Sequence, residues 1–173
     1  MATQANAQPF GANRARPLAA DGYEKFLAIA ALVLLAAVLV ALARGATQWG
    51  RVPPFVWLHL GTILVALGLT PLMLLGRRGD HRHRWLGRIW VVALTATALI
   101  SFGIRDANDG RFSFIHALSA WTLIQAPLIW WTARTHRVAR HRRAVRSMVT
   151  GALLIAGFFT FPFNRLLGQW LFG

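Results

Sequence analysis

Five long apolar runs, each without a charged side chain, leave this chain few ways to fold. The runs cover residues 26–43, 52–76, 89–104, 112–132 and 147–164. A helix needs roughly 20 residues to cross a bilayer, and four of the runs reach or approach that length. The third has only 16 residues, but Trp85 and Arg88 can extend it at the interface. Because a backbone in lipid must satisfy its own hydrogen bonds, the runs predict five transmembrane helices in an all-α membrane protein.

The composition favours a membrane protein over the other classes. Hydrophobic residues make up 56% of the chain, and 19 Lys and Arg stand against 5 Asp and Glu. A soluble domain of 173 residues cannot bury that much apolar side chain, and nucleic-acid binding would explain the charge but not the hydropathy. The absence of cysteine excludes disulfides, iron–sulfur clusters and covalent c-type haem. So few acidic residues also argue against a carboxylate-rich metal site.

The basic residues are distributed unevenly over the segments between the runs, and this predicts an orientation. The N-terminal segment and the segments after the second and fourth runs hold 14 of the 19. The positive-inside rule places these segments in the cytoplasm of a bacterial inner membrane and the C-terminus in the periplasm. Residues 1–22 predict a disordered cytoplasmic tail, and residues 23–173 a single transmembrane domain. The first run is interpreted as an uncleaved helix, because it is longer than a signal core and Arg44 follows directly.

The second and third runs resemble the fourth and fifth, as two copies of one hairpin. His59 and His116 lie a turn inside the second and fourth runs, and His83 and His141 follow them by 24 and 25 residues. The segments "HRWLGR" and "HRRAVR", which begin at the later histidines, both place arginine at +1 and +5. This order predicts a four-helix core of two repeated hairpins beside a peripheral first helix. It also places an outer pair, His59 and His116, and an inner pair, His83 and His141, at opposite membrane levels.

Paired histidines from separate helices suit a haem, since neutral imidazole is a good axial ligand for iron. Arg88 and Arg146 lie beside the inner pair, and a guanidinium can bond a haem propionate through two N–H groups. His81 and His136 lie in the same basic segments, and either can replace a member of the inner pair. The alternative for these segments is a role in membrane orientation and in binding anionic lipid.

The layout of the histidines over residues 53–163 resembles the cytochrome b561 family, which comprises transmembrane reductases with two b-type haems. In that family four consecutive helices supply the ligands, paired first with third and second with fourth. The resemblance implies two haem b groups, one between His59 and His116 and one between His83 and His141.

The local amino-acid sequence is more similar to another family. The stretches "LHLGTILVALGLTPLMLLGRR" and "HRHRWLGRIW" are similar to an uncharacterised bacterial membrane family, domain of unknown function 2306. That family is typified by an in-membrane histidine, an "HRxxGR" segment, a second in-membrane histidine and a later "HRxxxR". All four features occur here in that order.

These observations together predict an integral membrane cytochrome, a candidate oxidoreductase that moves electrons across the bilayer through two haems. A quinone is one expected redox partner, and a homodimer or larger membrane complex is one expected assembly. Nucleic acid is not an expected partner. The alternative prediction is a protein without a cofactor that works as an accessory subunit, a lipid-binding subunit or a small carrier.

Overall fold

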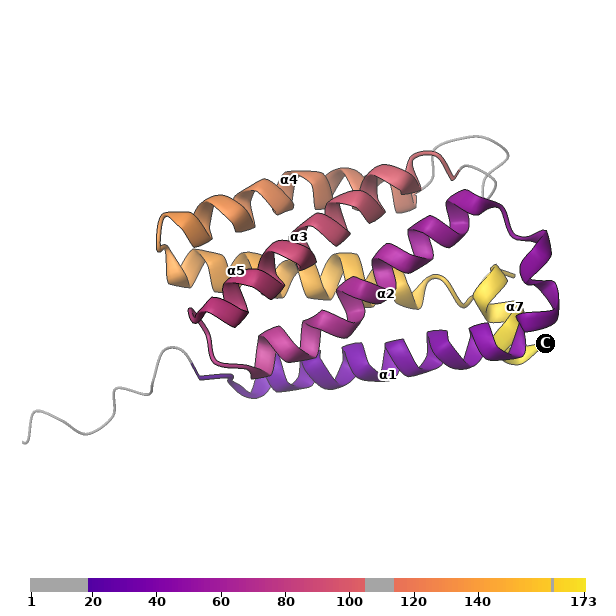
Figure 1. Ribbon diagram of the computed structural model, residues 1–173, viewed down its shortest axis with the longest axis horizontal. Helices are drawn as coiled ribbons and strands as arrows, with labels where there is room; N and C mark the ends of the chain where they lie inside the picture. Colours follow the sequence, from indigo (N-terminus) through magenta and orange to yellow (C-terminus); the bar gives the residue numbers. More distant parts are fainter. Residues whose placement is uncertain (1–18, 105–113, 163) are drawn as a thin grey trace, which may run out of the picture.

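The computed structural model describes residues 19–104, 114–162 and 164–173, and in this part of the chain it is all-helical (Figure 1). The α-helices are α1 (Gly22–Arg44), α2 (Pro54–Leu75), α3 (His81–Ser101), α4 (Phe114–Arg134), α5 (Val138–Met148), α6 (Ala156–Phe158) and α7 (Leu166–Phe172). A 3-10 helix, η1 (Ala46–Arg51), follows α1. A π-helix, η3 (Val149–Ile155), continues α5 directly into α6. The prediction of an all-α fold is confirmed.

Short-range sequence signals explain where the helices begin. Asp21 and Glu24 form a capping box, in which each side chain accepts the other residue's backbone N–H at 3.0–3.1 Å. Pro54 starts α2 at a position where its missing N–H costs nothing. Asp80 caps α3 by accepting the backbone N–H of His83 at 2.7 Å.

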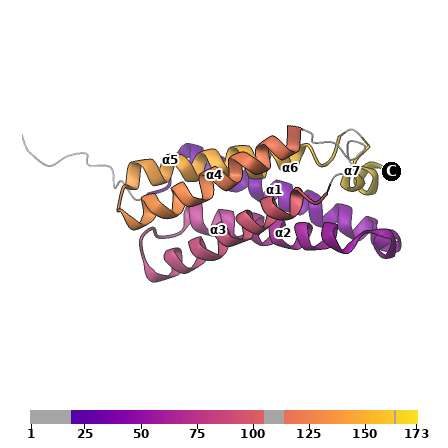
Figure 2. The ribbon, with the colours of Figure 1, turned by 90° about the horizontal axis from the view of Figure 1, so that it is seen from above.

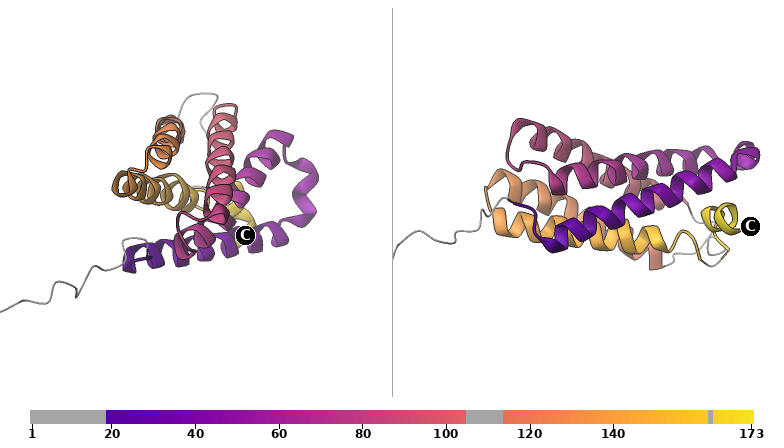
Figure 3. Two further views of the ribbon diagram at one scale, coloured as in Figure 1. Left: turned by 60° about the vertical axis from the view of Figure 1, so that its left-hand side comes forward. Right: turned by 90° about the horizontal axis from the view of Figure 1, so that it is seen from below.

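The long helices run side by side as an elongated bundle (Figures 1 and 2). α3 packs against both α2 and α4, and α4 packs against α5 and η3. The pairs α2–α3 and α4–α5 are therefore the two hairpins that the repeat predicts. Seen from below, α1 lies over α2 and over the continuous α5–η3 helix (Figure 3), and α7 folds back against α1.

A packed apolar layer fills the middle of the bundle. Leu27, Leu67, Trp90, Leu94 and Met148 come from four long helices, and all are at most 2% exposed. The indole of Trp90 donates its Nε1–H to the Thr70 hydroxyl at 3.0 Å, so this large side chain is buried without an unpaired donor. The layer separates the two ends of the bundle from one another.

The outside of the bundle carries many large apolar side chains. Phe26, Val33, Val92, Ile124 and Phe158, from helices α1, α3, α4 and α6, are 61–70% exposed. Water-soluble monomers rarely expose apolar patches on this scale. By length and composition α1 and α2 can cross a membrane, which supports membrane association. The remaining three spans and the orientation stay predictions.

Some sequence predictions fall outside the described residues. The predicted tail covers residues 1–22, and residues 1–18 of it lie outside the described part of the chain. Asp21, near the end of that range, is instead the N-cap of α1.

Candidate functional site

The bundle places the four predicted ligands at its two ends. His83 and His141 lie in the first turns of α3 and α5, at the end where α1 begins, and this end is called the arginine end. His59 and His116 lie near the starts of α2 and α4, at the opposite end, called the hydroxyl end. The predicted division into two levels therefore agrees with the antiparallel packing of the hairpins.

His83 and His141 lie within electrostatic range of one another, although they come from different hairpins. Both are half-buried and precede the apolar runs 89–104 and 147–164. Burial lowers the pKa of His83, and the charges of His141 and Arg78 lower it further against the opposing effect of Asp80. Burial also lowers the pKa of His141, partly offset by its hydrogen bond to the Ile129 carbonyl. Both imidazoles therefore favour the neutral form, which is the form that binds iron.

Backbone carbonyls orient one histidine at each end. Nδ1 of His141 lies 3.2 Å from the carbonyl oxygen of Ile129 on α4, and Nδ1 of His59 lies 3.2 Å from that of Thr97 on α3. A carbonyl can only accept, so Nδ1 must donate in both contacts. Nε2 then keeps its lone pair and is the atom available to a metal.

The surroundings of His83 also fit a ligated group. Its Nδ1 is buried and has no hydrogen-bond partner among the described residues. Gly87, one helical turn later on the same face, is half-buried, and a Cβ atom added there would meet nothing within 4 Å. An unpartnered ring nitrogen on His83 and the room at Gly87, one turn away, are compatible with a flat cofactor at this end. The packed side chains around Trp90 fill the middle of the bundle, so the space for a cofactor lies towards its ends.

The hydroxyl end binds its histidines to α3 through neutral contacts. The carbonyl of Thr97 accepts the Nδ1–H of His59, and the hydroxyl of Thr97 donates to the hydroxyl oxygen of Thr62 at 2.8 Å. His116 is 6% exposed, and its ring centroid lies 5.9 Å from that of Phe102. The Ser101 and Ser119 hydroxyls form a further hydrogen bond between α3 and α4. This end therefore joins α2, α3 and α4 without an ionic contact among the described side chains.

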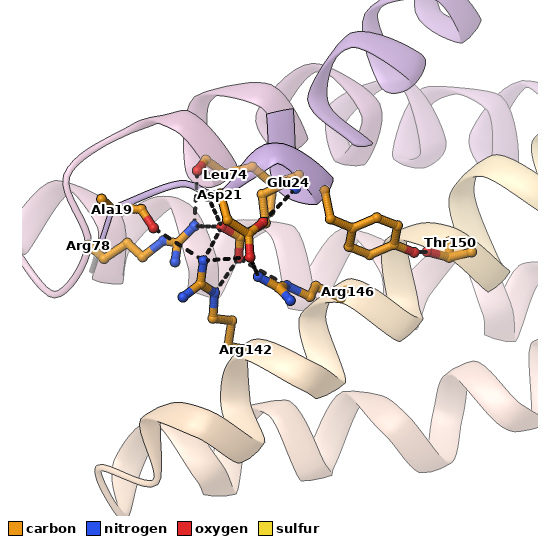
Figure 4. A network of polar contacts seen from close by, with 9 residues as sticks. Ala19, Asp21, Glu24, Leu74, Arg78, Arg142, Arg146 and Thr150 are labelled. Atoms are coloured by element: carbon orange, nitrogen blue, oxygen red, sulfur yellow. Dashed lines mark hydrogen bonds and ion pairs between the residues drawn. The ribbon is translucent and has the colours of Figure 1, made fainter. Parts of the chain in front are cut away.

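A buried carboxylate at the arginine end was not predicted from the sequence. Glu24 is 1% exposed and accepts from three arginines (Figure 4). Its Oε2 lies 2.5 Å from Arg78 and 2.7 Å from Arg142, and its Oε1 lies 2.7 Å from Arg142 and 3.2 Å from Arg146. Asp21 pairs with Arg142 at 3.2 Å and also with Arg146. These five residues form the Glu24 network, which ties α1 to α5 and to the segment after α2.

The carboxylates and the arginines of the Glu24 network stabilise one another's charged forms. The hydrogen bond from the Glu24 backbone N–H and the charge of Arg146 lower the pKa of Asp21. The hydrogen bond to Glu24 raises the pKa of Arg142. Both members therefore favour their charged forms. Arg78 links the network to the inner pair, because its charge also lowers the pKa of both histidines there.

The other predicted site residues have different surroundings. Arg146, expected beside a propionate, binds the carboxylates of Asp21 and Glu24. Arg88 is exposed and makes no hydrogen bond or ion pair with the described part of the chain. His81 and His136 are both exposed, so they are weaker candidates than the inner pair that they were expected to replace.

One signal in the sequence could have revealed Glu24. It is one of only five acidic residues, and it stands at the start of an apolar run on the side that holds most arginines. A carboxylate at such a position needs a cationic partner, since an unpaired buried charge is costly.

Comparison with known proteins adds no assignment. No protein-family model matches the chain, and neither a curated protein nor a solved structure matches it at a significant level.

Proposed function

We propose that this protein is an integral membrane b-type cytochrome that transfers electrons through two haem groups. The observation that carries the proposal is the inner pair. His83 and His141 come from different hairpins, are half-buried, favour the neutral form, and lie within electrostatic range of one another. Two half-buried, neutral imidazoles at one end of a bundle are a candidate for a functional site.

Each end of the bundle would hold one haem between its two histidines. His83 and His141 would hold one haem, and His59 and His116 the other. When bound, haem supplies one-electron oxidation and reduction. The Ile129 carbonyl keeps the proton of His141 on Nδ1 and thereby leaves the lone pair on Nε2 for iron, as the Thr97 carbonyl does for His59 at the other end.

The side chains between the two histidine pairs would influence electron transfer between them. Trp90, Leu94 and Met148 exclude water from the middle of the bundle, which keeps the dielectric low along the path between the levels. The positive charge of Arg78 beside the inner pair would favour the reduced state there.

The proposal includes five membrane spans, with the arginine end in the cytoplasm of a bacterial inner membrane. The exposed apolar side chains on α3, α4 and α6 support spans beyond α1 and α2. A quinone is the redox partner we expect, and a homodimer the assembly. The chain lacks cysteine, so single-cysteine variants test the orientation cleanly. His81→Cys should react with a membrane-impermeant maleimide only in inverted vesicles, and Trp49→Cys only in intact spheroplasts.

Optical spectroscopy tests the cofactor directly. Protein purified from haem-replete cells should be red, show an α-band after dithionite reduction, and contain two haems per chain. His83→Ala should lower the haem content to one. His81→Gln, two residues away on an exposed side chain, is the matched control and should retain both. A colourless, fully folded preparation would instead favour an accessory subunit or carrier without a cofactor.

A further inference from the structure

A cavity on the surface of α5 has a strongly basic lining. It has a volume of about 460 Å³ and lies beside the start of α1, at the arginine end. Its lining residues are Asp21, Val138, Ala139, Arg142, Arg143 and Arg146. Positions 138, 142 and 146 recur at intervals of four, as do 139 and 143, so they form one face of the helix.

The charge around this cavity does not balance. Two carboxylates, Asp21 and Glu24, face four arginines, of which Arg78, Arg142 and Arg146 bind them and Arg143 does not. The group therefore carries a net charge of +2, counted over these six side chains. Arg143 is exposed and makes no hydrogen bond or ion pair with the residues that the structure describes.

The Glu24 network also makes the cavity rigid. Arg142 and Arg146 are held from behind by a carboxylate that is 1% exposed, while their own side chains keep 24% and 26% exposure. Guanidinium groups fixed in this way lose little conformational freedom when an anion arrives. Arginine is suited to phosphate oxygens, which its planar fork can bond in pairs.

The rim of the cavity is apolar where α1 approaches. Val138 is 51% exposed and Tyr23 is 45% exposed, and the ring centroid of Tyr23 lies 5.7 Å from the Arg146 guanidinium carbon. Exposed Phe26 and Ile29 continue from Tyr23 along α1. An anionic group in the cavity would thus lie beside an outward-facing apolar strip, as the headgroup and chains of a lipid require.

We propose that this cavity binds the phosphate group of an anionic phospholipid, with the acyl chains along the exposed face of α1. Arg143 supplies the charge that the protein leaves uncompensated, and Arg142 and Arg146 add positive charge that Glu24 holds in place. The inference does not depend on haem, because none of the lining residues is a histidine.

The test uses full-length protein in a neutral maltoside detergent, titrated calorimetrically with dihexanoyl phosphatidic acid. Arg143→Gln should weaken binding roughly tenfold, the loss of one charge-assisted hydrogen bond. The matched control is Arg82→Gln, which removes one charge from an exposed arginine outside the cavity and should leave the affinity unchanged. Circular dichroism should show that both variants keep the helix content of the parent protein.

Two further titrations distinguish the source of the phosphate. Dihexanoyl phosphatidylcholine, whose headgroup is neutral overall, should not bind measurably, and inorganic phosphate should bind much more weakly than phosphatidic acid. Inorganic phosphate binding as tightly as the lipid would overturn the lipid assignment in favour of a soluble phosphate ligand. Equal weakening by Arg143→Gln and Arg82→Gln, or none by either, would overturn the site itself and leave only diffuse attraction to a basic surface.

Discussion

The two ends of the bundle join their helices by different physical means, although a backbone carbonyl orients one histidine at each end. At the arginine end the contacts are ionic, because Glu24 binds three arginines that are distant from it in the sequence. One of them, Arg78, lowers the pKa of both histidines there. At the hydroxyl end, neutral contacts from Thr97 on the central helix α3, and from Phe102 directly after it, hold His59 and His116. The arginine end should therefore respond most to loss of charge, whereas the hydroxyl end should respond mainly to shape.

The largest effect is expected from removing the buried carboxylate. Glu24→Gln keeps the shape of the side chain but leaves the guanidiniums of Arg78, Arg142 and Arg146 without their main anion. Breaking a buried ion pair on one side costs about 3–5 kcal/mol, and unfolding followed in detergent should show a loss of this order. Asp80→Asn removes an exposed carboxylate but keeps a good helix cap, so it should cost little. Equal stability of the two variants would show that the network contributes nothing.

The next effect concerns the independence of the ends. His116→Ala should remove about half of the bound haem and leave the arginine end occupied, because the layer around Trp90 separates the two levels. The absorbance of the reduced α-band per mole of protein measures this. Complete loss of haem from this variant would mean that the ends act as one site. Full retention would exclude His116 as a ligand.

In the protein without bound haem, the two histidines of the arginine end should contribute to the dependence of stability on pH. The pKa of His83 and that of His141 are lowered in the folded protein, mainly by burial, so the unfolded chain binds more protons as pH falls through about 6.5. Their contribution to stability is therefore present above that pH and is lost progressively below it, towards the lowered folded pKa. Unfolding measured between pH 8 and pH 5 should show this slope, and His141→Gln should flatten it. His81→Gln, which changes an exposed ring, should leave the slope intact.

The same contrast shows how far the sequence could predict the structure. Charge-free runs predicted the helical class, and the spacing of His59, His83, His116 and His141 predicted which ends they occupy, because both follow from local periodicity. The Glu24 network joins residues separated by 54, 118 and 122 positions. No local pattern specifies such a contact. The sequence therefore predicts a propionate beside Arg146, whereas in the structure Arg146 binds Asp21 and Glu24, which are more than 100 positions away in the chain.

The smallest effect is expected at the hydroxyl end. Thr97→Val removes the hydrogen bond that the Thr97 hydroxyl donates to Thr62 at 2.8 Å but keeps the volume of the side chain. The Thr62 hydroxyl still donates to the carbonyls of Leu58 and His59, so no polar group is stranded and the cost should be about 1 kcal/mol. Thr95→Val is the control, since its hydroxyl bonds only within its own helix, to the Val91 carbonyl. A loss for Thr97→Val that approaches the loss for Glu24→Gln would break the contrast, because neutral contacts would then stabilise their end as strongly as a buried charge does.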